Sequence, residues 1–472
     1  MAADKTQPEQ AAHTANLPVI IIGAGISGLS LAQHLRQLGI PFRIFERDTG
    51  VKSRGVGWGL TLNWSLPMLR SLVTPELLSR FPETYVDRQG IETGLCPRFP
   101  FYDLSNGDLK ATTPPLPETW GRTLSSFVET SESHFSGATR HGKTVTVTFE
   151  DGSKCVGSLL VACDGSNSRV RRALFPSLAS ENLYRIPIAV MGVKIHLSTA
   201  QIAGMRELDP YFLQGTSSQN DSFVYMSVLD APGNSPENDP DSYNLQICLS
   251  WPYRDGYLGR ERQLQVPDSQ ESRHKLFHEF AATYAEPFSS ILRAVTVDTE
   301  IKQIDLCDWP PPIGLHTKGN VVLMGDAMHQ MAMYRGEGAN HAIADVVDFA
   351  THVVPLLGRD ETAFTGSTDI GTIATVSTPA EPEVQHVASS RNPVNGNTNR
   401  HMSEATNISI QLRTALDAYE NVVVNRARPG VLASRRACLD AHDWTRIGPQ
   451  SPLLSRRQKD IVYDEVADMV VG

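Results

Sequence analysis

The chain has 472 residues, too many for one hydrophobic core, so we expect two domains. Its 42 basic and 52 acidic residues give a net charge of −10 without a basic cluster, which disfavours nucleic acid or an anionic membrane as a partner. The six cysteines lack metal-ligand spacing and no apolar run approaches the roughly 20 residues that span a bilayer, so we expect a cytoplasmic protein with reduced thiols, no metal site and no transmembrane segment.

A glycine-rich turn follows the first predicted strand. Val19–Ile22 is a short β-branched run, typical of a buried parallel strand. Gly23 permits a tight turn, Gly25 lets the backbone approach a pyrophosphate, and Gly28 lets the next helix pack closely on the sheet. Glu46, at the end of the next predicted strand, can accept hydrogen bonds from the ribose hydroxyls of an adenosine. The pattern predicts a dinucleotide-binding fold, and by itself it does not separate FAD from NAD(P).

Two acidic motifs follow further buried strands. The run 159–163 leads into Asp164, and the run 321–324 leads into Asp326. Both place a carboxylate at the carboxyl end of a parallel strand, where ligands bind in open α/β sheets. The chain is therefore predicted to leave the first domain after Asp164 and to return to it before Asp326. His329 lies among methionines without a second metal ligand at suitable spacing, which favours a structural or flavin-edge role.

The region between these motifs has a different pattern. Residues 178–310 contain short strands of alternating polarity, which predict an antiparallel sheet that carries the substrate. The face of this sheet that would line a pocket offers Tyr211, Tyr225 and Gln246.

Two segments are expected to be disordered. Residues 1–16 are polar and predict a disordered tail. Residues 359–412 are rich in Thr, Ser, Asn, Gly and Pro and nearly lack aromatic residues, so they cannot bury enough apolar surface to order themselves. The remaining residues, 413–472, are expected to form a C-terminal helical region.

The three motifs, together with the ending 418–444, resemble the single-component FAD-dependent monooxygenases of the aromatic-hydroxylase type. More narrowly, they resemble the fungal members that tailor aromatic polyketides. The resemblance implies an α/β fold in which a Rossmann-like FAD-binding domain is interleaved with an antiparallel-sheet substrate domain and followed by C-terminal helices. The implied FAD-binding parts are residues 17–177 and 311–358, and the substrate domain is residues 178–310.

The resemblance also implies roles for individual residues. In chain order the expected FAD contacts are Gly23, Gly25 and Gly28 at the pyrophosphate, Glu46 at the adenosine ribose, Gly59 beside the flavin, Arg122 as the family's FAD-contacting arginine, Asp164 near both FAD and the nicotinamide nucleotide, Asp326 at the ribityl hydroxyls, and Gly338 and Ala339 beside the flavin pyrimidine. A helix that begins at these last residues would stabilise the negative charge of reduced flavin.

The implied activity is an NAD(P)H-consuming monooxygenation that places one oxygen atom of O₂ on a small phenolic or polyketide-derived aromatic substrate. Tyr211 and Tyr225 are the candidate catalytic side chains, since a tyrosine in the pocket could favour the phenolate form of the substrate. Baeyer–Villiger insertion and epoxidation run on the same scaffold and stay open. Two non-oxygenating alternatives also stay open. One is a flavin-binding protein that is inactive because the region 122–146 is short, and the other is an NAD(P)-binding dehydrogenase.

Overall fold

The computed structural model describes residues 17–48, 59–113, 122–124, 135–141, 144–234, 240–357 and 397–465, with the backbone alone for 122–124, 135–141 and 397–408. The expected tail 1–16 and residues 359–396 of the expected insertion lie outside this part of the chain.

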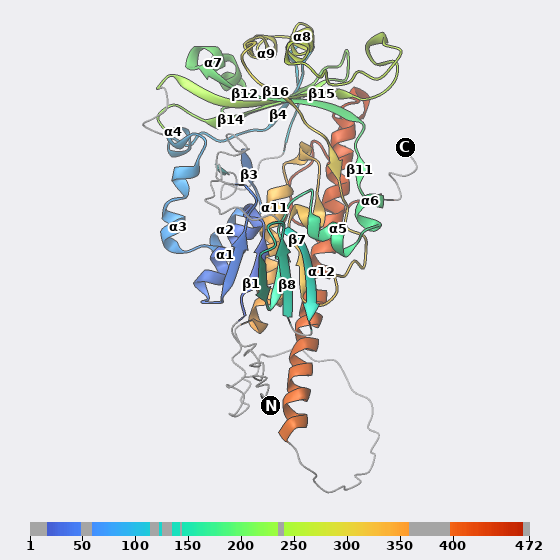
Figure 1. Ribbon diagram of the computed structural model, residues 1–472. Helices are drawn as coiled ribbons and strands as arrows, with labels where there is room; N and C mark the ends of the chain where they lie inside the picture. Colours follow the sequence, from blue (N-terminus) through green and yellow to red (C-terminus); the bar gives the residue numbers. More distant parts are fainter. Residues whose placement is uncertain are drawn as a thin grey trace, which may run out of the picture.

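A four-stranded parallel sheet forms the lower half of the molecule (Figure 1). Its order is β18 (Val321–Leu323), β10 (Leu159–Ala162), β1 (Val19–Ile22) and β2 (Phe42–Phe45). The three strands β18, β10 and β1 are buried throughout, because their apolar runs are covered on both faces. Since the strands are parallel, the residues that follow β1, β10 and β18 meet at one edge of the sheet.

Helices and a small sheet surround these strands. The helices α1 (Ile26–Gln37) and α11 (Gly338–His352) contribute Leu31, Leu35, Ile343 and Val346 to the core around the sheet. The shorter helices are α2 (Leu66–Leu72), α3 (Pro75–Ser79), α4 (Arg88–Glu92), α5 (Arg169–Leu174), α6 (Leu178–Glu181) and α10 (Asp326–His329). An antiparallel sheet of β7 (Phe135–His141), β8 (Thr144–Phe149) and β9 (Lys154–Gly157) lies beside them, and two strand pairs join β3 (Leu60–Leu62) to β6 (Arg122–Leu124) and β11 (Tyr184–Arg185) to β17 (Cys307–Asp308).

A seven-stranded sheet forms the upper half of the molecule (Figure 1). Its order is β16 (Ile301–Gln303), β12 (Ile188–Ser198), β15 (Ser242–Pro252), β14 (Phe223–Asp230), β13 (Phe212–Thr216), β4 (Pro100–Asp103) and β5 (Leu109–Thr112). The helices α7 (Thr199–Leu208), α8 (Gln270–Ala281) and α9 (Phe288–Arg293) cover its outer face. The strands β4 and β5 lie within residues 17–177, which were expected to belong to the FAD-binding domain. They join this sheet instead, because the fully buried β4 pairs in parallel with β13.

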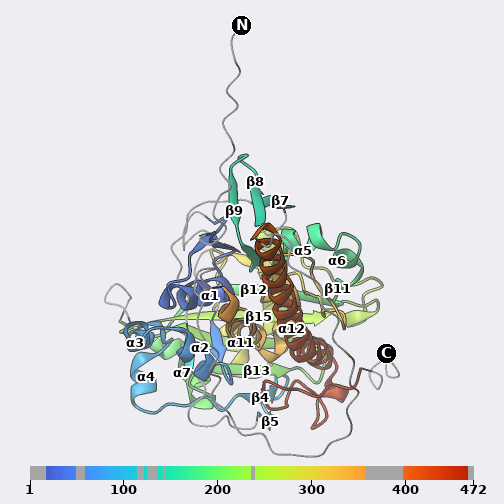
Figure 2. The same ribbon diagram turned by 90° about the horizontal axis from the view of Figure 1, so that it is seen from below.

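A long C-terminal helix, α12 (Asn397–Asp440), runs along the molecule beside α11 (Figures 1 and 2). It begins 15 residues before the expected end of the disordered insertion at residue 412, so that boundary was wrong. The physical reason is that residues 397–428 contain neither proline nor glycine, and nothing in them interrupts the helix. Pro429 and Gly430 lie inside the helix where it meets α11.

Gly430→Ala is expected to lower the free energy of unfolding by about 1–2 kcal/mol, although alanine ordinarily favours a helix. The added Cβ would lie 2.7 Å from Nε2 of His341, whose buried ring is held by a 2.8 Å hydrogen bond from Arg426. Urea unfolding of both proteins measures the change. Gly448→Ala is the matched control, because a Cβ there meets no atom within 4 Å. Equal effects of the two substitutions would contradict a close approach of α12 to α11.

The fold confirms the expected class, an α/β molecule with a Rossmann-like region, a second sheet and C-terminal helices. Among the helices of the described residues, none has both the length and the apolar character that crossing a membrane requires.

Candidate active site

A cavity of about 830 Å³ lies between the parallel sheet and the seven-stranded sheet. It is lined from both sides, by residues at the edge where the parallel strands end and by one face of the upper sheet. The residues singled out from the sequence that line it are Gly25, Gly59, Tyr211, Tyr225, Gln246, Asp326, Gly338 and Ala339. Two of these residues, Gly25 and Ala339, lie 314 positions apart in the sequence and line the same cavity.

The glycine turn after β1 is tightly packed on one side and open on the other. Gly23 has a φ of +101°, and a Cβ there would lie 2.2 Å from the carbonyl oxygen of Cys163. A Cβ on Gly28 would lie 2.0 Å from the carbonyl oxygen of Gly23. A Cβ on Gly25, by contrast, would meet no atom within 4 Å, and this residue borders the cavity. The backbone of the turn and the N-terminus of α1 are thus open to the cavity, where they can bind an anion.

The acidic residues after β2 and β10 are engaged within the protein. Glu46 accepts hydrogen bonds from the backbone N–H groups of Ala24 and Arg47, each at 2.8 Å, which ties the end of β2 to the glycine turn. Oδ2 of Asp164 accepts hydrogen bonds from the backbone N–H of Arg169, at 2.7 Å, and from the backbone N–H of Val170, at 3.2 Å. The carboxylate of Asp164 therefore caps the start of α5, while its buried Oδ1 has no partner within the described residues.

Asp326 presents its side chain to the cavity. This residue is exposed and lines the cavity. Burial raises the pKa of the Asp326 carboxyl, an effect that His329 and Arg171 oppose. Arg171 also joins the second motif to the third, since its Nη1 donates to the carbonyl oxygens of Asp326 at 3.0 Å and Ala327 at 2.9 Å. The sequence reasoning missed this link.

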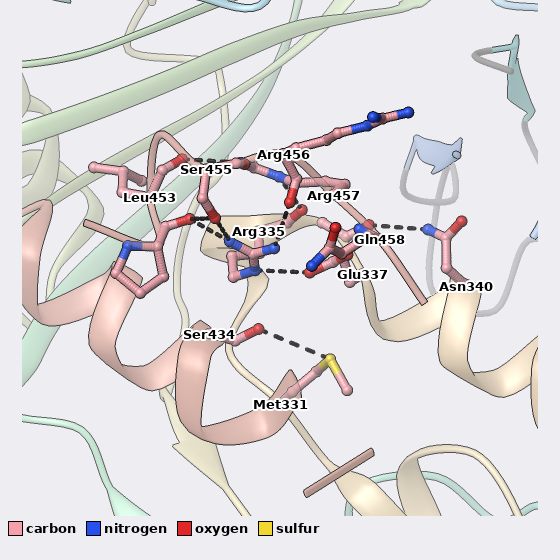
Figure 3. A network of polar contacts seen from close by, with 12 residues as sticks. Met331, Arg335, Glu337, Asn340, Ser434, Leu453, Ser455, Arg456, Arg457 and Gln458 are labelled. Atoms are coloured by element: carbon pink, nitrogen blue, oxygen red, sulfur yellow. Dashed lines mark hydrogen bonds and ion pairs between the residues drawn. The ribbon is translucent and has the colours of Figure 1, made fainter. Parts of the chain in front are cut away.

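The loop before α11 is held by buried polar contacts (Figure 3). Arg335 Nε donates to Glu337 Oε2 at 2.7 Å, and both side chains are at most 1% exposed. Glu337 Oε1 accepts from Trp64 Nε1 and from the backbone N–H of Gln458, each at 3.1 Å. Arg335 also donates to Ser455 Oγ at 2.7 Å. The loop is thus fixed between an early segment and the C-terminal segment 451–458.

Asn340 fixes the first turn of α11 to β3. Its Oδ1 accepts from the backbone N–H of Asn63 and from Ser65 Oγ, each at 2.8 Å, and its Nδ2 donates to the Thr61 carbonyl at 2.9 Å. These bonds place Gly338 and Ala339 at the cavity wall. Arg122 is described by its backbone alone, which pairs with Leu62 at the end of β3.

The two candidate tyrosines lie on different parts of the upper wall. The Tyr211 hydroxyl donates to the Leu95 carbonyl at 3.3 Å. Tyr225 projects from β14 opposite Gln214 of β13. Burial raises the pKa of both phenols above their ordinary value, so both are protonated near neutral pH. Neither is therefore a general base at that pH, and the one hydroxyl proton of Tyr211 is already donated to Leu95.

A buried charged cluster lies behind the cavity. His329 Nε2 is 2.7 Å from Asp345 Oδ2, and both side chains are fully buried. Arg426 of α12 donates to Asp345 Oδ1 at 2.5 Å, to Asp348 Oδ2 at 3.1 Å and to Nδ1 of His341. His329 therefore has the structural position that its neighbours predicted.

His316, Asp417 and Glu420 also come together, with one ligand atom of each within 4.8 Å of the others. Arg413 already contacts both carboxylates, at 2.9 Å and 2.8 Å, and supplies the cation of this cluster.

Known proteins are similar to this chain in sequence. The family profile for an FAD-binding domain matches residues 125–359, and that for an NAD(P)-binding Rossmann-like domain matches residues 21–64. An Arthroderma benhamiae protein with the name "Probable FAD-dependent monooxygenase" is 36% identical over 468 residues, 93% of this chain and 95% of its own. The FAD-dependent monooxygenase dbaB of Emericella nidulans is 33% identical over 72% of this chain and 87% of its own.

Solved structures share the fold at low identity. The complex of Klebsiella pneumoniae HpxO with FAD and uric acid has a TM-score of 0.62 and 17% identity, over 93% of this chain and 92% of that one. A salicylate hydroxylase substrate complex has a TM-score of 0.58 and 17% identity, over 94% and 93%.

Proposed function

This chain belongs to the FAD-dependent monooxygenases, and we propose that it uses NAD(P)H and O₂ to place one oxygen atom on a phenolic or polyketide-derived aromatic substrate in fungal secondary metabolism. The observation that carries the proposal is that one cavity joins the edge of the parallel sheet to the inner face of the seven-stranded sheet. A cofactor held at the edge and a planar substrate held under the sheet would share this space.

The residues present fit FAD. The open backbone at Gly25 and the N-terminus of α1 suit a pyrophosphate, and the Asp326 carboxylate faces the cavity without a side-chain hydrogen bond to the described residues. FAD would supply the electron transfer and the oxygen activation that the reaction requires. The N-terminal end of α11, at Gly338 and Ala339, would favour negative charge beside it.

The protein's own part in the reaction is to position the substrate and to exclude water. Phe99, Phe223 and Met331 supply apolar lining, and the protonated Tyr225 can donate a hydrogen bond to a substrate oxygen. Tyr211 could donate to the substrate only by giving up its bond to the Leu95 carbonyl. We do not assign either tyrosine a proton-abstracting role, because the pKa of each is raised.

The purified enzyme, loaded with FAD, is expected to consume NADH or NADPH faster when a suitable phenol is present. In ¹⁸O₂ the product should gain one labelled oxygen atom, and in labelled water it should gain none, which mass spectrometry measures. A product oxygen that comes from labelled water, or turnover that persists without O₂, would contradict monooxygenation and indicate a flavin dehydrogenase. The product's ring structure, determined by NMR, separates hydroxylation from epoxidation and Baeyer–Villiger insertion.

A further inference from the structure

A buried arginine from the C-terminal segment lines the cavity. Arg457 is 8% exposed, and its guanidinium donates only to backbone carbonyls: Nε to Arg335 at 3.0 Å, and Nη1 to Leu453 at 3.0 Å and Ser455 at 2.6 Å (Figure 3). Within the described residues Nη2 has no hydrogen-bond partner. The side chain is thus fixed in place while part of its donor capacity is free.

The charge of Arg457 has no ion-pair partner among the described residues. The acidic residue nearby, Glu337, is already bonded by Arg335, Trp64 and the backbone of Gln458. Burial and the neighbouring Arg335 lower the pKa of Arg457 to about 9, so the group is still a cation at neutral pH. A buried charge without a counterion is costly, and in a ligand cavity it suits an anionic ligand.

The neighbouring wall of the seven-stranded sheet carries two amides that each have one atom without a hydrogen-bond partner among the described residues. Strand register places Gln214 opposite Tyr225 on neighbouring strands, and Ser227 opposite Gln246, so all four residues share one face. Gln214 and Gln246 are each 5% exposed and line the cavity. Gln214 Nε2 and Gln246 Oε1 are buried and have no hydrogen-bond partner in the described part of the chain. Buried amides of this kind are rare unless a ligand completes them.

We propose that Arg457, together with Gln214 and Gln246, binds the oxygen-bearing edge of the aromatic substrate in its ionised form. A phenolate oxygen would accept from the Arg457 guanidinium, and a neighbouring hydroxyl would accept from Gln214 Nε2 and donate to Gln246 Oε1. This inference rests on the proposed function, and it makes Arg457 a determinant of substrate specificity. By favouring the phenolate, Arg457 would also supply the electron-rich ring that oxygen insertion requires.

The test uses the FAD-loaded enzyme with two probes, 1,3-dihydroxyanthraquinone and its dimethoxy counterpart, and reads binding from the change in flavin absorbance. The wild-type enzyme is expected to bind the dihydroxy probe more tightly, with a preference that grows as the pH rises and the phenol ionises. Arg457→Met should weaken binding of that probe roughly 10- to 100-fold, the range for a hydrogen bond to a charged group. It should leave the Kd of the dimethoxy probe unchanged.

Arg457→Lys should restore part of the preference, because the cation is retained. Arg456→Met is the matched control, since the neighbouring side chain is exposed and only its backbone carbonyl contacts Arg335. If Arg457→Met does not fold, Gln246→Leu keeps the inference testable, and it too should reduce the preference for the dihydroxy probe.

Two results would overturn the inference while the proposed function stands: a wild-type enzyme without preference for the dihydroxy probe, or an Arg457→Met enzyme that loses FAD affinity but keeps the preference. A charge-dependent preference in an enzyme that transfers no oxygen from O₂ would instead contradict the proposed function and leave the anion site in place.

Discussion

Arg426→Met is expected to lower the free energy of unfolding by about 3–5 kcal/mol at pH 7, the range for removing one partner of a buried ion pair. Arg426 bonds Asp345, Asp348 and His341 at once, and its side chain is 3% exposed. Without it, the carboxylate of Asp345 loses its contact with a guanidinium and keeps the 2.7 Å contact with Nε2 of His329. Urea unfolding of the two proteins measures the difference.

The control is Arg428→Met on the same helix. Arg428 pairs with Glu465 at 2.7 Å, but the two side chains are 21% and 35% exposed, so a loss of about 0–1 kcal/mol is expected. Similar losses for Arg428→Met and Arg426→Met would contradict a special role for the buried cluster.

The effect of Arg426→Met should shrink as the pH falls. Burial and Arg426 lower the pKa of His341 well below its ordinary value, so the native wild-type protein keeps this histidine neutral. A lowered pKa adds stability above the ordinary pKa of about 6.5, and this contribution is lost as the pH falls toward the lowered value. Without Arg426 the pKa of His341 should be lowered less, although burial still lowers it, so the variant should lose less stability between pH 7 and pH 5 than the wild type does.

Asp326→Ala is expected to raise the Kd for FAD roughly 10- to 100-fold, because it removes a charged hydrogen-bond acceptor that faces the cavity. Its side chain bonds no described residue, so the apoprotein should unfold at the same urea concentration as the wild type. Flavin absorbance after gel filtration, and titration of apoprotein with FAD, measure retention and affinity.

Asp305→Ala, at an exposed carboxylate, is the control and should leave FAD binding unchanged. His329→Ala should act differently from Asp326→Ala. It removes the 2.7 Å contact to Asp345 and should lower stability more than it lowers FAD affinity. Undiminished FAD affinity in Asp326→Ala would show that the carboxylate does not contact the cofactor.

Local patterns in the sequence were enough to predict the parallel strands, the glycine turn and the fold class. The run Val19–Ile22, for example, is apolar at every position and is followed by glycines, which indicates a buried strand and a turn without reference to the rest of the chain.

The polar half of the site could not be predicted in this way. Arg457 contacts a loop 122 residues earlier in the chain, and Arg426 contacts residues 78 to 85 positions away. Gln246 was expected to line the pocket, but Gln214 appears as an ordinary strand residue until the register of β13, β14 and β15 places the two on one face. The capping role of Asp164 was also missed, because a carboxylate after a strand fits a cofactor contact and a helix cap equally well.

The contacts between Arg335 and the C-terminal segment have a consequence for how the protein is made. Arg335 bonds Pro452, Ser455 and Arg456, the first of which is translated 117 residues later. While the ribosome is still adding α12, the loop beside the cavity has none of these partners. Assembly of the cavity is therefore a late event in biosynthesis, and a chain released after Asp440 would carry all three glycine and acid motifs without the segment that fixes the loop before α11.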